Sequence, residues 1–289
     1  MWQEGRLVPA IIRADAIVMT TAFPSSRRAL IFLAAAFAIT WVAWGTLVVL
    51  ADSQITAYGQ WPYMTLYVLG GLGPTIAAYI AVCLTTSQAP LSEFHQRLLR
   101  WRVPLPWYGV AFALPVLLAF MAIGIAVALR PSLSTLVAIK PWSAFPLLFA
   151  MMIIGGGLEE LGWRGVTQEE WGRAIGQGRA AALIGPIWAV WHLPLFFLPG
   201  VSQYHAHFAL FLVGVVGNAL LFGWLYSHTR SILLCVFMHA ATNATIAMGV
   251  IIPAHQGLSL IAPCLSLGVG ALLFLSSGKR VVQADSVTH

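Results

Sequence analysis

Eight apolar runs of about twenty residues follow one another along the chain, separated by short polar segments. Apolar and polar residues do not alternate within these runs, as they would in the strands of a transmembrane barrel. Each run therefore predicts a membrane-spanning helix. The predicted spans cover residues 29–50, 62–85, 106–129, 143–166, 180–198, 207–227, 231–251 and 258–276. The pattern indicates an all-α, multi-pass transmembrane bundle of about eight spans.

The polar segments at the two ends of the chain indicate one domain between two tails. We expect a single transmembrane domain over residues 29–276, between a polar N-terminal tail (1–28) and a short C-terminal tail (277–289). Between the second and third spans, residues 91–104 carry apolar side chains at helical spacing among basic ones. This stretch is typical of an amphipathic segment that lies along the lipid headgroups.

Charge is scarce and unevenly placed. Only 8% of the 289 residues are charged, against roughly 25% in soluble domains, which predicts an integral membrane protein. Of the fifteen lysine and arginine residues, only Arg130 and Lys140 fall on the side opposite the N-terminus, and Arg164 lies within a span. This bias predicts that both termini are cytosolic, in the plasma (inner) membrane. The basic residues on the cytosolic side account for the net charge of +6, so we expect no nucleic-acid partner. Glu169 and Glu170 are expected to face cytosolic water.

The fourth span ends on a charged stretch, "GGGLEELGWRG", residues 155–165. Charges inside a span are costly and are kept where they have partners or a function. In a continuous helix, Glu160 and Arg164 are four residues apart on one face and form a favourable pair. Glu159 points about 100° away and is left without a partner. The three glycines, 155–157, allow a neighbouring backbone to approach closely.

Two other predicted spans carry polar residues at a similar depth. His192 lies about 18 Å into the fifth span, with Trp188 one turn before it on the same face. In the seventh span, His239 and Asn243 form a second i, i+4 pair, about 12 and 18 Å deep. Each of these residues alone is also typical of a hydrogen bond between helices. Their shared depth with Glu159 predicts one site.

The residue types favour hydrolysis by activated water. A carboxylate and an imidazole can remove a proton from water and direct it at a carbonyl, and a histidine with an asparagine can donate hydrogen bonds to the resulting oxyanion. A serine or cysteine in a nucleophile motif is absent near these residues, which disfavours a covalent intermediate. The H-E-x-x-H zinc motif is also absent. We therefore expect no metal or other cofactor, although the same four polar residues are able in principle to bind zinc.

Three short motifs resemble those of a known family. "EELGWR" (159–164) is similar to E-E-x-x-x-R, "WAVWH" (188–192) to F-x-x-x-H, and "HAATN" (239–243) to H-x-x-x-N. These are the motifs of the CAAX protease and bacteriocin-processing (CPBP, or Abi) family, which includes the Ras-converting prenyl endopeptidases. The resemblance covers residues 140–250, the expected catalytic part. Trp188 departs from the motif's usual phenylalanine and could narrow the substrate channel.

The resemblance implies a role for each matched residue. In the family, the residues at Glu159 and His192 activate water, and those at His239 and Asn243 form the oxyanion hole. Three further residues are implied to support the site: Glu160, Arg164 and Trp188.

These observations predict an intramembrane, glutamic-type endopeptidase whose site opens towards the cytosol. Its expected partners are the lipid bilayer and a peptide or protein substrate, with or without a lipid anchor. Two alternatives remain open. One is a non-catalytic membrane partner or immunity protein with the same fold. The other is a proton-coupled transporter in which Glu159 and His192 relay protons; the chain shows neither an inverted repeat nor the expected broken helices at matched positions.

Overall fold

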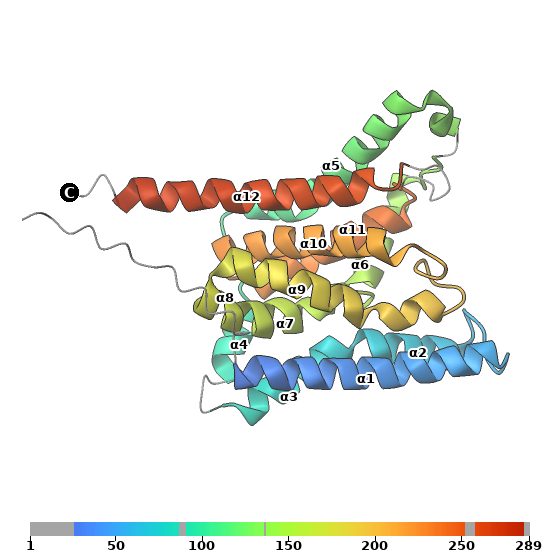
Figure 1. The fold of residues 1–289 in the computed structure, drawn as a ribbon, viewed down its shortest axis with the longest axis horizontal. Helices are drawn as coiled ribbons and strands as arrows, with labels where there is room; N and C mark the ends of the chain where they lie inside the picture. Colours follow the sequence, from blue (N-terminus) through green and yellow to red (C-terminus); the bar gives the residue numbers. More distant parts are fainter. Residues whose placement is uncertain (1–25, 87–90, 136, 252–257, 286–289) are drawn as a thin grey trace, which may run out of the picture.

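The computed structural model describes residues 26–86, 91–135, 137–251 and 258–285. These residues form helices that run back and forth along one axis (Figure 1), and no strand occurs among them. Within these residues, five helices are long and apolar enough to cross a membrane, or six if one bent pair counts as a single span. The prediction of an all-α, multi-pass membrane bundle is confirmed, whereas the count of eight spans stays a prediction.

The first half of the bundle contains five α-helices and a short 3-10 turn. Their bounds are α1 (Arg27–Asp52), α2 (Trp61–Gly71), α3 (Gly73–Leu84), α4 (Leu91–Leu98), α5 (Pro106–Leu129) and η1 (Pro131–Thr135). The hydroxyl of Ser26 caps the first turn of α1 by accepting from the Ala29 N–H. Helices α2 and α3 form the bent pair, with an angle of 42° between them.

The second half is more interrupted. Its elements are η2 (Trp142–Ala144), α6 (Phe145–Ile154), η3 (Gly157–Glu159), α7 (Glu160–Gly162), the π-helix η4 (Trp163–Gln168), α8 (Glu169–Ile175), α9 (Gln177–Trp191), η5 (Leu193–Phe197), α10 (Phe208–Thr229), α11 (Ile232–Ala247) and α12 (Ile261–Asp285). The Ser231 hydroxyl caps α11 through the Leu234 N–H.

Two of the predicted spans are not regular α-helices throughout. The predicted second span is bent between α2 and α3. The predicted fourth span, 143–166, lies within one candidate span, Trp142–Ile175, but α6 ends at Ile154, and Gly155 and Gly156 form a turn before η3 begins. Gly156 has a φ of 144°, a conformation that residues with a side chain rarely adopt. The glycines thus end the helix as well as allowing close approach, and the absence of broken helices no longer argues against a transporter.

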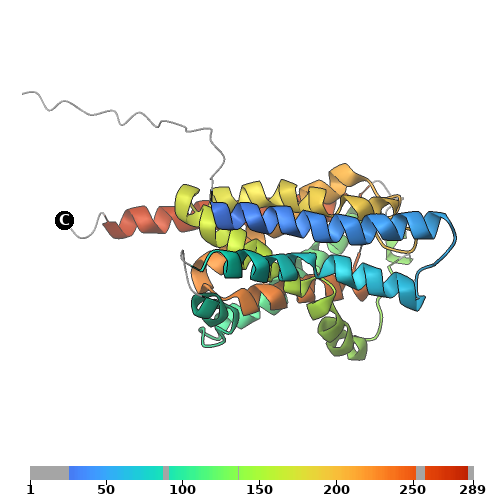
Figure 2. The same ribbon diagram turned by 90° about the horizontal axis from the view of Figure 1, so that it is seen from below.

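The second half of the chain forms the centre of the bundle. Helix α10 packs between α9 and α12, and α11 packs against α5 and α6, while α1 packs along α2 and α3. In Figures 1 and 2, the start of α1, the last turns of α12 and α4 lie at the same end of the bundle; we call this the α4 end. The largest fully buried side chains are those of Trp163, Trp171 and Trp191. The Phe32 ring of α1 packs edge-on against Trp163, with ring centroids 5.2 Å apart.

The predicted domain boundaries stay predictions. Most of the expected N-terminal tail, residues 1–25, lies outside the described residues. At the other end, α12 continues through residue 276 to Asp285.

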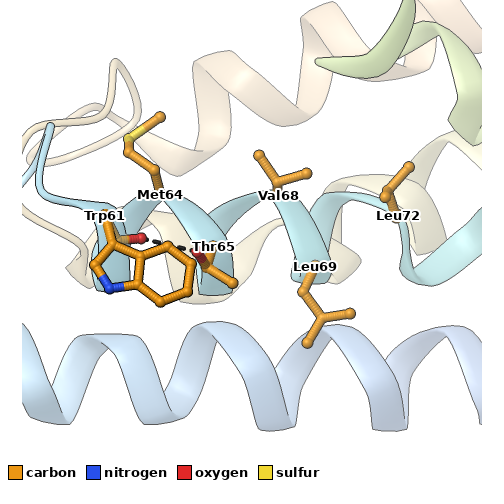
Figure 3. A pocket seen from close by; sticks show the side chains of 6 residues that line it. All are labelled: Trp61, Met64, Thr65, Val68, Leu69 and Leu72. Atoms are coloured by element: carbon orange, nitrogen blue, oxygen red, sulfur yellow. Dashed lines mark hydrogen bonds between the residues drawn. The ribbon is translucent and has the colours of Figure 1, made fainter.

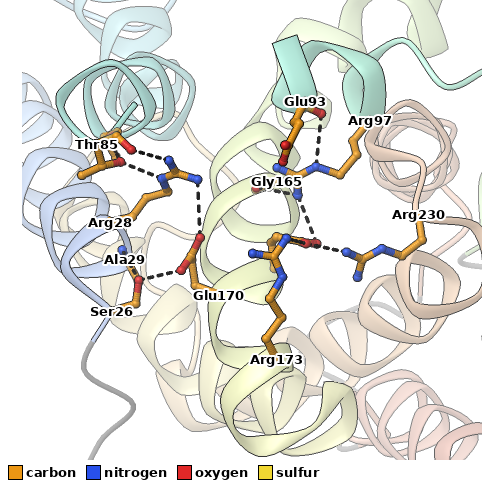
Figure 4. Close-up of polar contacts among 12 residues, drawn as sticks. Ser26, Arg28, Ala29, Thr85, Glu93, Arg97, Gly165, Glu170, Arg173 and Arg230 are labelled. Carbon is orange, nitrogen blue, oxygen red and sulfur yellow. Dashed lines mark hydrogen bonds and ion pairs between the residues drawn. The ribbon is translucent and has the colours of Figure 1, made fainter. Parts of the chain in front are cut away.

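A buried carboxylate joins three arginines at the α4 end. The side chain of Glu169 accepts the hydroxyl of Tyr226 at 2.6 Å and the guanidinium of Arg97 at 3.1 Å. Arg173 and Arg230 donate to its other oxygen, and Figure 4 shows the three arginines converging. Since Glu169 is only 1% exposed, the expectation that it faces water is wrong.

Glu170 also has protein partners. Its carboxylate accepts a hydrogen bond from Ser26 at 2.9 Å and lies 3.5 Å from the guanidinium of Arg28 (Figure 4). Arg28 in turn donates to the hydroxyl and carbonyl of Thr85 at the end of α3. The side chain of Glu170 is 16% exposed, so it ties α8 to α1 and α3 instead of extending into solvent.

A shallow apolar hollow of about 530 Å³ follows one face of α2 (Figure 3). Its lining residues all come from α2 or the residue after it: Trp61, Met64, Thr65, Val68, Leu69 and Leu72. None of the predicted site residues lines it. The hollow does not test the expectation that a site opens towards the cytosol, which stays a prediction.

Candidate active site

The break after α6 brings the two adjacent glutamates against α11. A Cβ atom at Gly156 would collide with the side-chain amide of Asn243 and lie 3.0 Å from Nε2 of His239. A Cβ at Gly157 would lie 2.9 Å from the carbonyl oxygen of Val236. Only glycine permits this approach, and the chain then turns through η3 so that the glutamates face the neighbouring helices.

Glu160 has a basic partner on each oxygen. Oε2 accepts from Nε of Arg164 at 2.7 Å, and Oε1 lies 2.9 Å from Nδ1 of His239. Both Glu160 and Arg164 are fully buried. The expected i, i+4 pair is therefore present, and the contact with His239 adds a link from α7 to α11 that the sequence did not indicate.

Glu159 is partnered differently. It is 6% exposed, and its Oε2 accepts a hydrogen bond of 2.8 Å from Nε1 of Trp188. Within the part of the chain that the structure describes, Glu159 forms no ion pair. Two consecutive carboxylates thus differ: one is held between two basic groups, and the other contacts a neutral indole.

His192 follows directly on the last residue of α9. Its Nδ1 lies 2.8 Å from the carbonyl oxygen of Trp188. A carbonyl oxygen only accepts hydrogen bonds, so Nδ1 carries the hydrogen, and Nε2 of a neutral ring is an acceptor. This tautomer follows from the partner and leaves Nε2 suited to receive a proton.

The Trp188 indole connects the segments. Its ring centroid lies 5.8 Å from that of His192 and 5.3 Å from that of His239, and its N–H reaches Glu159. Asn243 lies one turn beyond His239, donating to the Gly155 carbonyl at 3.2 Å. The structure therefore brings Glu159, His192, His239 and Asn243, drawn from three separate segments, around one indole and the glycine break.

Trp44 of α1 and Trp191 form an aromatic wall beside His192, which the sequence did not predict. The ring of Trp44 lies 6.4 Å from that of His192 and 4.9 Å from that of Trp191. Its N–H donates to the Tyr67 carbonyl in α2, which holds the wall in place. A tryptophan in mid-span was the one available indication, because such residues otherwise gather near the headgroups.

A metal site was left open by the sequence. Among the described residues, no group of three or more histidine, cysteine, aspartate or glutamate side chains is arranged to hold a metal ion.

Comparison with known proteins finds a similarity to one family and to one of its named members. Residues 141–245 match the model of the type II CAAX prenyl endopeptidases, Rce1-like, and this stretch contains all three motifs. Over this stretch the chain is similar to that family. It is also similar to CAAX prenyl protease 2 of Methanococcus maripaludis, with 24% identity over 225 residues, which are 74% of this chain and 82% of the relative. The resemblance noted in the three motifs is confirmed.

This similarity supports a CAAX-prenyl-protease-like membrane endopeptidase that acts on a peptide or protein. It favours a protease over the transporter considered above.

Proposed function

We propose that the chain is an intramembrane endopeptidase in which Glu159 and His192 activate water to hydrolyse a peptide bond. The observation that carries this proposal is the unequal partnering of the two adjacent glutamates. Glu160 is occupied by Arg164 and His239, whereas Glu159 contacts the Trp188 indole and no cation among the described residues. A base must be able to take up a proton, and Glu159 is the carboxylate without a competing ion pair.

The proposed first step is the attack of water on the scissile carbonyl carbon. One water proton passes to Glu159 or to Nε2 of His192, the new C–O bond forms, and the carbonyl oxygen becomes an oxyanion. The tetrahedral intermediate then collapses, the C–N bond breaks, and the proton is returned to the leaving amine. No covalent bond to the enzyme is required.

His239 and Asn243 are the proposed donors to the oxyanion. Because Nδ1 of His239 donates to Glu160, its Nε2 is a second donor only when both ring nitrogens carry a hydrogen. Asn243 contributes a side-chain amide one turn away on the same helix. Two donors fixed in advance stabilise the developing charge without reorganisation.

The proposed substrate is a C-terminal CAAX-type peptide, with or without a lipid on its cysteine. The match to the type II CAAX prenyl endopeptidases and the similarity to CAAX prenyl protease 2 support this class. We further propose that the protein resides in the plasma (inner) membrane with its site open to the cytosol. The excess of basic residues on the side of the N-terminus supports that orientation.

A cleavage assay with a matched histidine control tests the proposed enzyme. The purified protein is given quenched fluorescent peptides ending in a CAAX sequence, with and without a prenyl group. We expect the parent to cleave at least one of them and His192→Gln to lower the rate by about 10²–10⁴-fold. His228→Gln is the control, because His228 is exposed and lies in the last turn of α10. Full activity of His192→Gln would contradict the proposed role of His192.

A further inference from the structure

Positive charge is in excess around Glu169. Arg97, Arg173 and Arg230 share this one carboxylate, so one charge is balanced and two are not. The side chain of Arg97 is 15% exposed and also donates to the Tyr226 hydroxyl. Those of Arg173 and Arg230 are 56% and 34% exposed. The uncompensated charge therefore lies mainly on the outer two arginines.

These outer two guanidinium groups converge. Nη2 of Arg173 and Nη2 of Arg230 both donate to Oε1 of Glu169, so the two nitrogens lie within about 5 Å of each other. The Arg230 guanidinium also stacks over the Tyr226 ring, 5.1 Å from its centroid. Neither guanidinium makes a further hydrogen bond to any described residue. Two positive charges held this close favour the binding of a further anion beside them.

The remaining donors fit a phosphate group. A guanidinium presents its N–H groups as a planar fork that matches phosphate oxygens, and such contacts are charge-assisted and strong. Each of the two guanidinium groups uses one N–H group for Oε1 of Glu169. Their other N–H groups are able to bind a second anion without displacing Glu169.

The surroundings indicate where that phosphate comes from. Arg100 lies beside Arg230, since it donates to the carbonyl of Thr229 at the end of α10. Trp101, at the same end of the bundle, is 61% exposed and has the Arg102 guanidinium 5.0 Å from its ring. Exposed tryptophan among arginines is typical of the level of the lipid headgroups, and basic clusters between helices at that level bind anionic lipids.

We propose that Arg173 and Arg230 form a binding site for the phosphate group of an anionic phospholipid. The site lies between α8 and the end of α10, at the α4 end of the bundle. It is separate from the candidate active site and does not depend on the proposed hydrolysis.

Lipid retention in matched double variants tests this proposal. The full chain is purified in detergent, incubated with phosphatidylglycerol, phosphatidylcholine or inorganic phosphate, and examined by native mass spectrometry. The test variant is Arg173→Gln with Arg230→Gln, which leaves Glu169 paired with Arg97 and so keeps the buried carboxylate neutralised. The control is Arg27→Gln with Arg179→Gln, an equal loss of charge at exposed residues that bond no carboxylate among the described residues.

We expect the parent and the control to retain phosphatidylglycerol more strongly than phosphatidylcholine, and the test variant to bind phosphatidylglycerol about 30-fold more weakly. An equal loss in the two double variants would overturn the proposal, because it would show a diffuse effect of charge. Displacement of phosphatidylglycerol by inorganic phosphate at equal concentration would also overturn it, because a free anion would then be the occupant. Equal thermal midpoints for the two variants establish that the comparison is between folded proteins.

Discussion

At the scale of single residues, Trp188 links the parts of the candidate site. It donates to Glu159, contacts both imidazole rings and lies 5.7 Å from the Arg164 guanidinium. The family motif usually has phenylalanine at this position, and phenylalanine has no N–H to donate. The tryptophan therefore gives this chain a way to fix the orientation of the proposed base.

Trp188→Phe removes that hydrogen bond and keeps an aromatic ring in place. We expect kcat/KM to fall roughly 10- to 100-fold, because a hydrogen bond to a charged group is worth about 1.5–3 kcal/mol. The matched control is Trp191→Phe, since Trp191 is as buried but its N–H has no hydrogen-bond partner among the described residues. Equal losses of peptide cleavage in the two variants would contradict the role of the Trp188 N–H.

The sequence predicts some of these contacts and not others. The pair formed by Glu160 and Arg164 was predictable, because four residues separate them within one helical segment. The bond between Trp188 and Glu159 spans 29 residues and depends on how α9 is rotated about its axis. Helical periodicity gives relative faces within a segment but not the rotation of one segment against another.

At the scale of elements, the break after α6 positions the site. The apolar run alone indicated a continuous span, because glycine is common in membrane helices and does not by itself predict a break. The close approach predicted for the three glycines is observed at Gly156, which faces Asn243 and His239. The positive φ of Gly156 and the turn it allows depend on this contact with α11. The pattern of apolar residues in one sequence does not show contacts between separate helices.

Gly156→Ala tests the need for the break. The added methyl group meets two side chains and a strained backbone, so we expect a loss of roughly 1–3 kcal/mol of stability and of most activity. Gly124→Ala in α5 is the control, because nothing lies within 4 Å of its added Cβ. Thermal unfolding in detergent measures both variants; a Gly156→Ala protein as stable and active as Gly124→Ala would contradict the interpretation.

At the scale of the whole molecule, the two ends of the bundle differ in charge. Arginines gather at the α4 end, where α1 starts and α12 finishes (Figure 1). The bias was predictable from the sequence, but the burial of Glu169 was not. Glu169 directly follows the π-helix of residues 163–168. The wider turn of a π-helix changes the face on which later residues lie.

Fusion reporters test the predicted orientation in a bacterial host. We expect a fluorescent protein fused to the C-terminus to fluoresce and alkaline phosphatase at the same place to be inactive, because the basic end stays in the cytosol. The reverse pattern should appear for fusions within residues 198–207, the connection between η5 and α10. An active phosphatase at the C-terminus would contradict the orientation.

The central claim is that Glu159, and not its neighbour, activates water, and comparison of Glu159→Gln with Glu160→Gln tests it most directly. Peptide cleavage and the thermal midpoint are measured for both variants. We predict that Glu159→Gln keeps the parent's midpoint and loses about 10²–10⁴-fold in kcat. Glu160→Gln should lose about 3–5 kcal/mol of stability, because it leaves the buried Arg164 without its counter-charge. A stable Glu159→Gln protein that cleaves the peptide at the parent's rate would contradict the account.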